Sequence, residues 1–196
     1  ARFGSPRVLA TGVVVTLAAR MIAAVAGLAP FGALDVVALV VVAALVPFVE
    51  WFVHRLILHL EPRRLGAVLI DPGAGHREHH ANPSTINWVL LRGVDAALFL
   101  VVNGAVAVVV VGGPLWLVGS AVVGPALTAM VGAAAALAHY EWAHFLFHTA
   151  YRPRSGRYRR LKANHRRHHW RDERAWLGIT SNLADRALGT MAPAER

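Results

Sequence analysis

The stretch 139–170, HYEWAHFLFHTAYRPRSGRYRRLKANHRRHHW, decides the fold because it carries six of the eleven histidines of the chain. The other five lie in a second window, residues 50–80, and no histidine lies outside the two windows. Imidazole is the side chain that proteins use most often to bind metals. Its confinement to two windows indicates that the histidines are placed for a shared function.

Four histidine spacings occur in these windows, and each has a helical interpretation. They are HxxxxH at 54 and 59, HxxHH at 76, 79 and 80, HxxxH at 144 and 148, and HxxHH at 165, 168 and 169. Residues three or four apart share one face of an α-helix, so each HxxHH can direct three rings to one point. His54 and His59 lie about 140° apart on an ideal helix. We therefore expect them to serve different ions, close to a helix end before Pro62.

These spacings predict ten metal ligands and exclude His139, which lies well off the face of the HxxxH pair. The predicted ligands are His54, His59, His76, His79, His80, His144, His148, His165, His168 and His169. Ten imidazoles are too many for one ion and fit two ions with about five nitrogens each. Neutral imidazole suits iron, zinc, copper or nickel, so the ligand type alone does not choose the metal.

An internal repeat accompanies the histidines. A constant offset of 89 residues relates the last four histidines of the first window to the last four of the second, and Glu50-Trp51 is echoed by Glu141-Trp142. We interpret the chain as one domain, 1–196, with two pseudo-repeats, about 1–90 and 91–175, followed by a C-terminal tail. Convergence without duplication is the alternative, and it would leave the site unchanged.

Apolar composition points to a membrane protein. Hydrophobic residues make up 56 % of the chain, more than a soluble core of this size needs. Runs long enough to span a bilayer lie at about 8–29, 34–53, 94–112 and 115–138. We predict an all-α integral membrane fold, with four transmembrane helices in two hairpins and a cytosolic helical cap that holds the histidines. Gly112-Gly113-Pro114 is expected to turn the chain between the last two spans, and residues 62–75 to form a loop.

The net charge of +9 follows membrane topology rather than a nucleic-acid partner. The predicted turns at 28–33 and 112–114 contain no Lys or Arg, whereas twelve of the twenty lie beyond residue 150. This positive-inside pattern predicts that both histidine windows face the cytoplasm, at an inner membrane. A signal peptide cleaved before Gly27 is an alternative for the N-terminal run, and it would not change this sidedness.

Carboxylates near the histidines are candidates to accept the second N–H of the ligand rings. Glu50 lies one turn before the first histidine, and Glu141 lies three residues before the HxxxH pair. Asp172, Glu173 and Asp185 follow the last HxxHH, and Asp185 is the favoured one of the three. The chain contains no cysteine, so thiolate metal sites and iron–sulfur clusters are excluded within it. Electrons for any redox chemistry must therefore come from another protein.

The order of the four histidine motifs resembles the fatty acid hydroxylase superfamily, which includes fatty acid 2-hydroxylases, sterol methyl oxidases, sterol C-5 desaturases and β-carotene hydroxylases. Further matches are EWxxHRxxxH at 50–59, YExxH at 140–144 and LGITS at 177–181, continuing through Asp185 to Gly189-Thr190. The resemblance covers about residues 45–191. The tail, residues 170–190, resembles the fatty acid and sterol branch, and we expect it to form a final amphipathic segment against the membrane face.

The resemblance implies a membrane-bound non-haem diiron oxygenase that hydroxylates an unactivated C–H bond of a fatty acyl or related lipid. Its cofactors would be two iron ions, with zinc able to replace them in purified protein, and O₂. Its partners would be the lipid substrate and a separate electron-transfer protein, a ferredoxin or a cytochrome b5-like protein, with its reductase. Trp51, Trp142, Phe145 and Phe147 are expected to line the substrate path, and core packing is an equally open role for them.

Two alternatives remain from the sequence. A desaturase or a sterol or carotenoid oxidase would use the same centre, because the outcome depends on how the substrate is positioned. A metal-ion transporter is less favoured, because it would need polar ligands near the bilayer midplane, where the predicted spans offer only Arg20 and Asn103. The basic segment 152–174 fits an acidic redox protein or lipid headgroups, or is simply topology charge.

Overall fold

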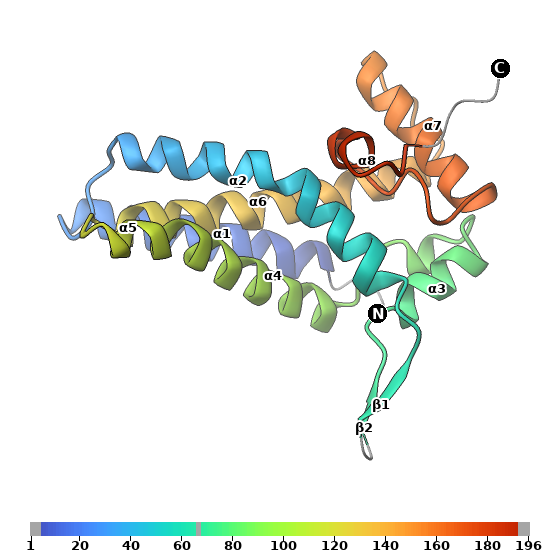
Figure 1. Cartoon of the computed structure of the whole chain (residues 1–196), viewed down its shortest axis with the longest axis horizontal. Helices are drawn as coiled ribbons and strands as arrows, with labels where there is room; N and C mark the ends of the chain where they lie inside the picture. Colours follow the sequence, from blue (N-terminus) through green and yellow to red (C-terminus); the bar gives the residue numbers. More distant parts are fainter. Residues whose placement is uncertain (1–4, 66–67, 192–196) are drawn as a thin grey trace. The chain divides into compact units, whose positions relative to one another are not determined.

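A computed structural model describes residues 5–65 and 68–191 of the chain (Figure 1). The chain divides into two compact units. The span unit contains 1–46 and 91–139, and the histidine unit contains 47–90 and 140–196. Both units are built almost entirely from helices, which confirms the predicted helical class.

Four helical segments are long and apolar enough to cross a membrane, as predicted. They are α1, Ser5–Val25; α2, Ala33–Phe52, extended by the π-helix η1, Val53–Leu58; α4, Gly93–Ala107, extended by the π-helix η3, Val108–Gly112, and α5, Gly113–Leu117; and α6, Val123–Phe147. Large aliphatic side chains such as Val15, Ile22, Val101 and Val109 are exposed on these helices. Such continuous apolar surface is stable only in lipid, so the chain is an integral membrane protein.

The predicted turn at 112–114 is wrong, because the helix continues through these residues to Leu117. Gly112 and Gly113 both have helical φ and ψ values, so η3 leads directly into α5 although Pro114 lacks an N–H donor. The chain instead turns after Leu117, where Gly119 adopts a φ of 68° that side chains disfavour.

Small residues let the helices of the span unit pack closely. A buried cluster joins Ala38 of α2, Ala107 and Val111 of the third segment and Ala129 of α6. At Gly12 of α1, an added Cβ would lie 2.6 Å from Leu100 Cδ1 of α4, so the Leu100 side chain fills the space that a larger residue would need. This is how membrane helices associate when lipid removes the hydrophobic drive between them.

Arg20 forms a buried polar network within the span unit. Its guanidinium donates to Asp35 Oδ1 at 2.8 Å, to Thr128 Oγ1 at 2.8 Å and to the Ala29 carbonyl at 2.8 Å. It also lies 3.7 Å from the centre of the Phe31 ring. The charge is therefore compensated on all sides, which makes an intramembrane arginine tolerable.

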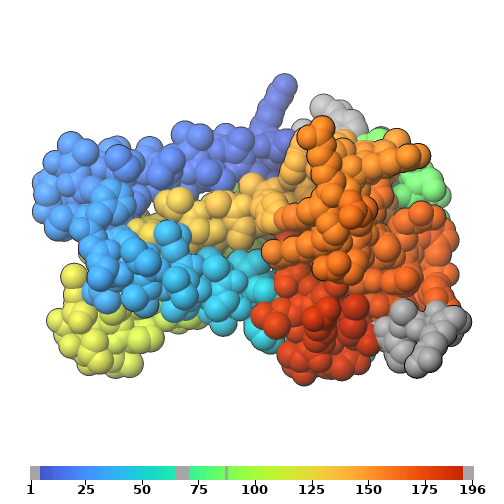
Figure 2. Space-filling model, turned by 90° about the horizontal axis from the view of Figure 1, so that it is seen from above, coloured from blue at the N-terminus to red at the C-terminus, as the bar shows by residue number. Residues whose placement is uncertain are grey.

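In the described residues, the histidine unit contains a β-hairpin and four helices besides the ends of α2 and α6. These are a β-hairpin of β1, Arg63–Leu65, and β2, Val68–Ile70; α3, Ala74–Ala81; the 3₁₀-helix η2, Ile86–Trp88; α7, Gly156–Trp170; and α8, Leu183–Ala187. The hairpin replaces most of the loop expected at 62–75. Arg77 of α3 closes its base by donating to Asp71 Oδ1 at 2.6 Å and to the Leu60 carbonyl at 2.7 Å. Figure 2 shows α7, in orange, with side chains projecting from the surface.

Candidate metal centre

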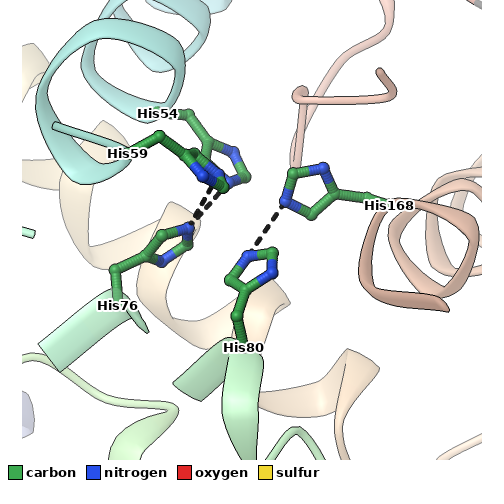
Figure 3. A group of neighbouring side chains, drawn as sticks. All are labelled: His54, His59, His76, His80 and His168. Carbon is green, nitrogen blue, oxygen red and sulfur yellow. Dashed lines mark hydrogen bonds between the residues drawn. The ribbon is translucent and has the colours of Figure 1, made fainter. Parts of the chain in front are cut away.

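All ten histidines predicted as ligands converge into two groups of five. The first group is His54, His59, His76, His80 and His168 (Figure 3), and the second group is His79, His144, His148, His165 and His169. Within each group the candidate ligand nitrogens lie within 4.8 Å of one another. His139 belongs to neither group. Both groups lie entirely in the histidine unit.

Each group takes four rings from its own half of the chain and one ring from the other half. His168 completes the first group, and His79, which is 89 residues earlier, completes the second. The expectation that each HxxHH directs three rings to one point is therefore wrong. On an α-helix, the residue four positions after a given residue lies about 40° from it around the helix axis. The residue three positions after it lies about 60° away in the opposite direction. Two neighbouring sites can therefore share one helix.

His54 and His59 lie in the same group, which corrects the expectation that they serve different ions. The helix does end near Pro62, at Leu58, but its last six residues form the π-helix η1. Hydrogen bonds from i to i+5 bring residues five apart over one another. The two rings consequently stack, with centroids 5.3 Å apart and an interplanar angle of 19°.

The nitrogens in each group have the spacing of metal ligands. In the first group, Nε2 to Nε2 distances are 3.1 Å for His54–His76, 3.2 Å for His59–His76 and 3.1 Å for His80–His168. In the second group they are 3.1 Å for His79–His169, 3.1 Å for His165–His169 and 2.7 Å for His148–His165. Two ligands at about 2.1 Å from an ion and at right angles lie about 3.0 Å apart. The groups therefore match the edges of coordination polyhedra.

Hydrogen bonds outside the groups fix which nitrogen carries the proton. A backbone carbonyl only accepts, so a ring nitrogen that contacts one must donate its N–H. Three Nδ1 atoms make such bonds: His54 to Leu177 at 2.6 Å, His168 to Ala175 at 2.9 Å and His148 to Pro83 at 2.8 Å. In each of these neutral rings, Nε2 must then be a bare lone pair directed into its group.

A facing pair of lone pairs shows why a cation fits. His168 Nε2 lies 3.1 Å from His80 Nε2. His80 Nδ1 lies 3.1 Å from the Glu173 carboxylate, whose negative charge favours the proton on this nitrogen although the contact lacks hydrogen-bond geometry. Two lone pairs at this distance cannot hydrogen-bond to each other. A metal ion between them converts the repulsion into two bonds, so the residues fit transition-metal binding.

The pKa shifts favour the neutral rings that metals require. Burial, followed by the charge of neighbouring histidines, lowers the pKa of His79 to about 2 and of His80 to about 3. Burial likewise lowers the pKa of His168 to about 3 and of His148 to about 4, and it holds the pKa of His165 well below its usual range. At neutral pH these rings are uncharged ligands.

Two of the three carbonyls that accept from histidine Nδ1 atoms belong to the buried segment 175–180, which we call the strap. All six strap residues are buried, which the prediction of a membrane-surface tail did not anticipate. Trp176 has a φ of 54°, an unusual conformation for a large residue that costs about 1–3 kcal/mol. The carbonyls on either side of it, from Ala175 and Leu177, are the ones that accept from the first group.

Two of the predicted outer carboxylates hold the strap and not the rings themselves. Asp185 accepts from the Leu177 and Gly178 amides, both at 2.9 Å. Glu50 accepts from the Thr180 amide at 3.1 Å and from the Thr180 hydroxyl. The direct pairing expected between Glu50 and the first histidine is thus replaced by a chain of contacts through the strap.

The other acidic residues near the histidines make different contacts from those expected. Glu173, which the sequence analysis left open beside Asp172, lies against His80, while Asp172 accepts from the Arg174 amide at 2.9 Å. Glu141 is buried on α6 with 4 % exposure. Backbone carbonyls were missed as partners altogether, because no sequence pattern marks which carbonyl will face a ring.

The four predicted substrate-path aromatics lie in different surroundings. Phe147 is buried in a cluster with Leu161 and Ile179, which is core packing. Trp142 is 61 % exposed and stacks on Phe145, with ring centroids 5.9 Å apart. Trp51 is half-buried, and its Nε1 donates to Thr190 Oγ1 at 2.9 Å.

Comparison with known proteins agrees with this geometry. The model of the fatty acid hydroxylase family, described as "Fatty acid hydroxylase", matches residues 39–190. No curated protein and no solved structure matches the chain. The matched residues include both histidine groups and the strap, and they make up more than half of the chain. The chain therefore belongs to the fatty acid hydroxylase family, whose membership implies an oxidoreductase acting on lipids.

Proposed function

We propose that the chain is an O₂-dependent hydroxylase that places a hydroxyl group on an unactivated C–H bond of a fatty acyl or related lipid. The observation that carries the proposal is the convergence of ten imidazoles in two groups of five, each with its candidate ligand nitrogens within 4.8 Å of one another. The overall reaction consumes one O₂, two electrons and two protons, and yields the alcohol and one water. Two iron ions, when bound, would supply the O₂ reduction and hydrogen abstraction.

The residues of the chain have three tasks in this proposal. The two groups hold the ions, with His79 and His168 joining the halves. The strap keeps the rings of His54 and His168 in the tautomer that a metal requires. The exposed apolar faces of the spans keep the unit in the bilayer, where a lipid substrate is dissolved.

Incorporation of labelled oxygen tests the reaction. Cells expressing the chain under ¹⁸O₂ should accumulate a lipid carrying one ¹⁸O atom, and His168→Ala should abolish it while the protein still inserts. His139→Ala is the matched control, because His139 lies outside both groups. Loss of two hydrogens without added oxygen would identify a desaturase, which is the second candidate. A hydroxylated sterol or carotenoid would redirect the substrate class.

A metal transporter is less well supported. Its ligands would have to lie in the span unit, where Arg20 and Asp35 already bond to each other and to Thr128. Iron-dependent O₂ consumption by the purified protein would reject transport as the primary function.

We also propose that the histidine unit lies on the cytoplasmic side of the inner membrane, on the basis of the positive-inside charge pattern. The chain has no cysteine, so a single cysteine placed at Ser155 is a unique reporter. A membrane-impermeant thiol reagent should label it in inverted vesicles and leave it unlabelled in intact cells. Labelling in intact cells would contradict the assignment.

A further inference from the structure

The outward face of α7 differs sharply from its inward face. Arg159, Ala163, Arg166 and Trp170 are all exposed, and at 100° per residue they fall within about 60° of one another. The opposite side of the same helix carries buried residues, including three histidines of the two groups. One helix therefore presents imidazoles inward and cations with an indole outward.

Trp170 connects the two faces. Its side chain is 57 % exposed, and its ring centroid lies 5.7 Å from that of His169 in the second group. The Arg166 guanidinium lies 6.0 Å from the centre of the same indole ring. An aromatic ring that touches both a site histidine and the exterior is a short path between the exterior and the second group.

The surrounding charge defines the kind of partner. Residues 152–174 contain ten Lys and Arg against two acids, a net of +8 in a chain whose total is +9. Such a field attracts a negatively charged partner and raises its association rate. We call Arg159, Arg166 and Trp170 the basic face.

The basic face does not have the composition of a membrane-surface helix. An interfacial helix buries a stripe of large apolar residues in the lipid. On α7 the aliphatic Leu161 is 2 % exposed and packs in the core with Phe147 and Ile179, while the outward stripe carries arginine. Charge complementarity with a protein is therefore the better match than insertion into lipid.

We propose that the basic face docks an acidic one-electron carrier protein, and that electrons enter through the contact between Trp170 and His169. This rests on the proposed function, whose reaction needs two electrons for each O₂. The chain has no cysteine to hold a cluster of its own. Each docking event oxidises one carrier by one electron, so two reduced carriers are consumed for each hydroxylation, and two protons come from solvent.

Binding is tested with a plant-type [2Fe–2S] ferredoxin as the acidic probe and the full-length protein in nanodiscs of neutral lipid. The double variant Arg159→Glu/Arg166→Glu should weaken binding at least about tenfold, with a reduced salt dependence. The matched control is Arg63→Glu/Arg64→Glu on the hairpin, whose arginines are also exposed, and it should bind as the parent does. Equal binding by both double variants, or equal weakening, would overturn the docking surface.

Electron entry is tested separately by mixing reduced ferredoxin under anaerobic conditions with the protein loaded with ferric iron, which each electron reduces to ferrous iron. Trp170→Leu should slow ferredoxin oxidation about tenfold while ferredoxin binding and iron content change less than twofold, and Trp170→Phe should recover much of the rate. An unchanged rate in Trp170→Leu would remove the indole from the path. The exposed Trp116 on α5 supplies the control substitution, Trp116→Leu, which should leave the rate unchanged.

Lipid is the competing occupant, and vesicles of phosphatidylcholine with one quarter phosphatidylglycerol test it. If the double variant loses vesicle binding but keeps ferredoxin binding, the face serves lipid and the proposal fails. Failure of the proposed function is distinguishable, because ferredoxin binding and anaerobic oxidation need no lipid product. A chain that oxidises ferredoxin through the basic face but forms no hydroxylated lipid would retain this inference and lose the hydroxylase assignment.

Discussion

The two histidine groups carry corresponding rings, yet the contacts behind those rings differ. In the first group, the Nδ1 atoms of His54 and His168 donate to the strap, whereas His80 Nδ1 lies 3.1 Å from Glu173 without hydrogen-bond geometry. In the second group, His148 bonds to the Pro83 carbonyl, whereas the Nδ1 atoms of three others are buried without a hydrogen-bond partner in the described part of the chain. These are His79, His165 and His169.

The difference teaches that a repeat can copy ligand positions without copying their support. The strap follows the second HxxHH and has no counterpart after the first, where Asn82 and Pro83 end α3. Outer hydrogen bonds typically change metal affinity 10–100-fold. We therefore expect the first group to retain its ion more tightly than the second.

Removing His168 or His79, each of which completes the group of the other half, should have the largest effect. His168→Ala leaves the first group with four rings and removes the strap contact to Ala175, so we expect loss of activity by at least about 100-fold. Metal analysis should show that the first ion is lost. His79→Ala should instead empty the second group, and an identical metal loss in both variants would contradict two separate sites.

Acid should destabilise both groups, because they share lowered pKa values. Burial lowers the pKa of His80 and His168 to about 3 and of His148 to about 4, while an unfolded histidine has a pKa near 6.5. The unfolded chain therefore binds more protons below pH 6.5, and folding stability falls from there toward pH 3–4. The Tm of the metal-free protein in detergent should drop by about 10 °C or more between pH 7 and pH 4.5. A flat profile would argue against neutral buried rings.

Weakening the strap should affect only the first group. Asp185→Asn removes charge from the bonds to the Leu177 and Gly178 amides, and we expect about tenfold faster loss of the first ion to a chelator. Asp95→Asn on α4 is the control, since Asp95 bonds to Arg92 in another part of the chain. Loss of the second ion at the same rate as the first would show that the strap supports both groups.

Glu141→Gln should have the smallest effect of these substitutions, and it should act on the second group. Glu141 is buried on α6, three residues before His144 of the second group. We expect a few-fold faster release of the second ion, with the first ion unchanged. Release kinetics with a colorimetric chelator would measure this, and unchanged kinetics would remove Glu141 from the outer contacts.

Composition and spacing were enough to predict the spans and the ten converging histidines, because apolar length and helical periodicity are local properties of the sequence. The pairing of the rings was not predictable in the same way. His54 and His59 share a group only because η1 is a π-helix, and i to i+5 bonding leaves no clear mark in the residues VHRLIL. The exchange of His79 and His168 depends on tertiary packing of α3 and α7.

The predictions for the tail and for the turn at 112–114 were wrong for different physical reasons. The amphipathic tail, residues 170–190, suggested a membrane-surface segment, but Asp185 and Glu50 satisfy the backbone of the strap within it and bury the strap beside the histidines. At 112–114 the turn prediction relied on glycine and proline as helix breakers. Both glycines instead adopt helical φ and ψ values, so η3 continues into α5, and Pro114 removes one backbone donor without ending the helix.

Because His79 and His168 each complete the group of the other half, the ligands of each group are synthesised in a fixed order. Four rings of the first group are made within the first 80 residues, but the fifth is not made until residue 168. No ion can reach its full nitrogen count on a nascent chain that stops short of α7. Complete loading would therefore report that both halves have been translated and have met, and an ion bound in either group would link one half of the molecule to the other.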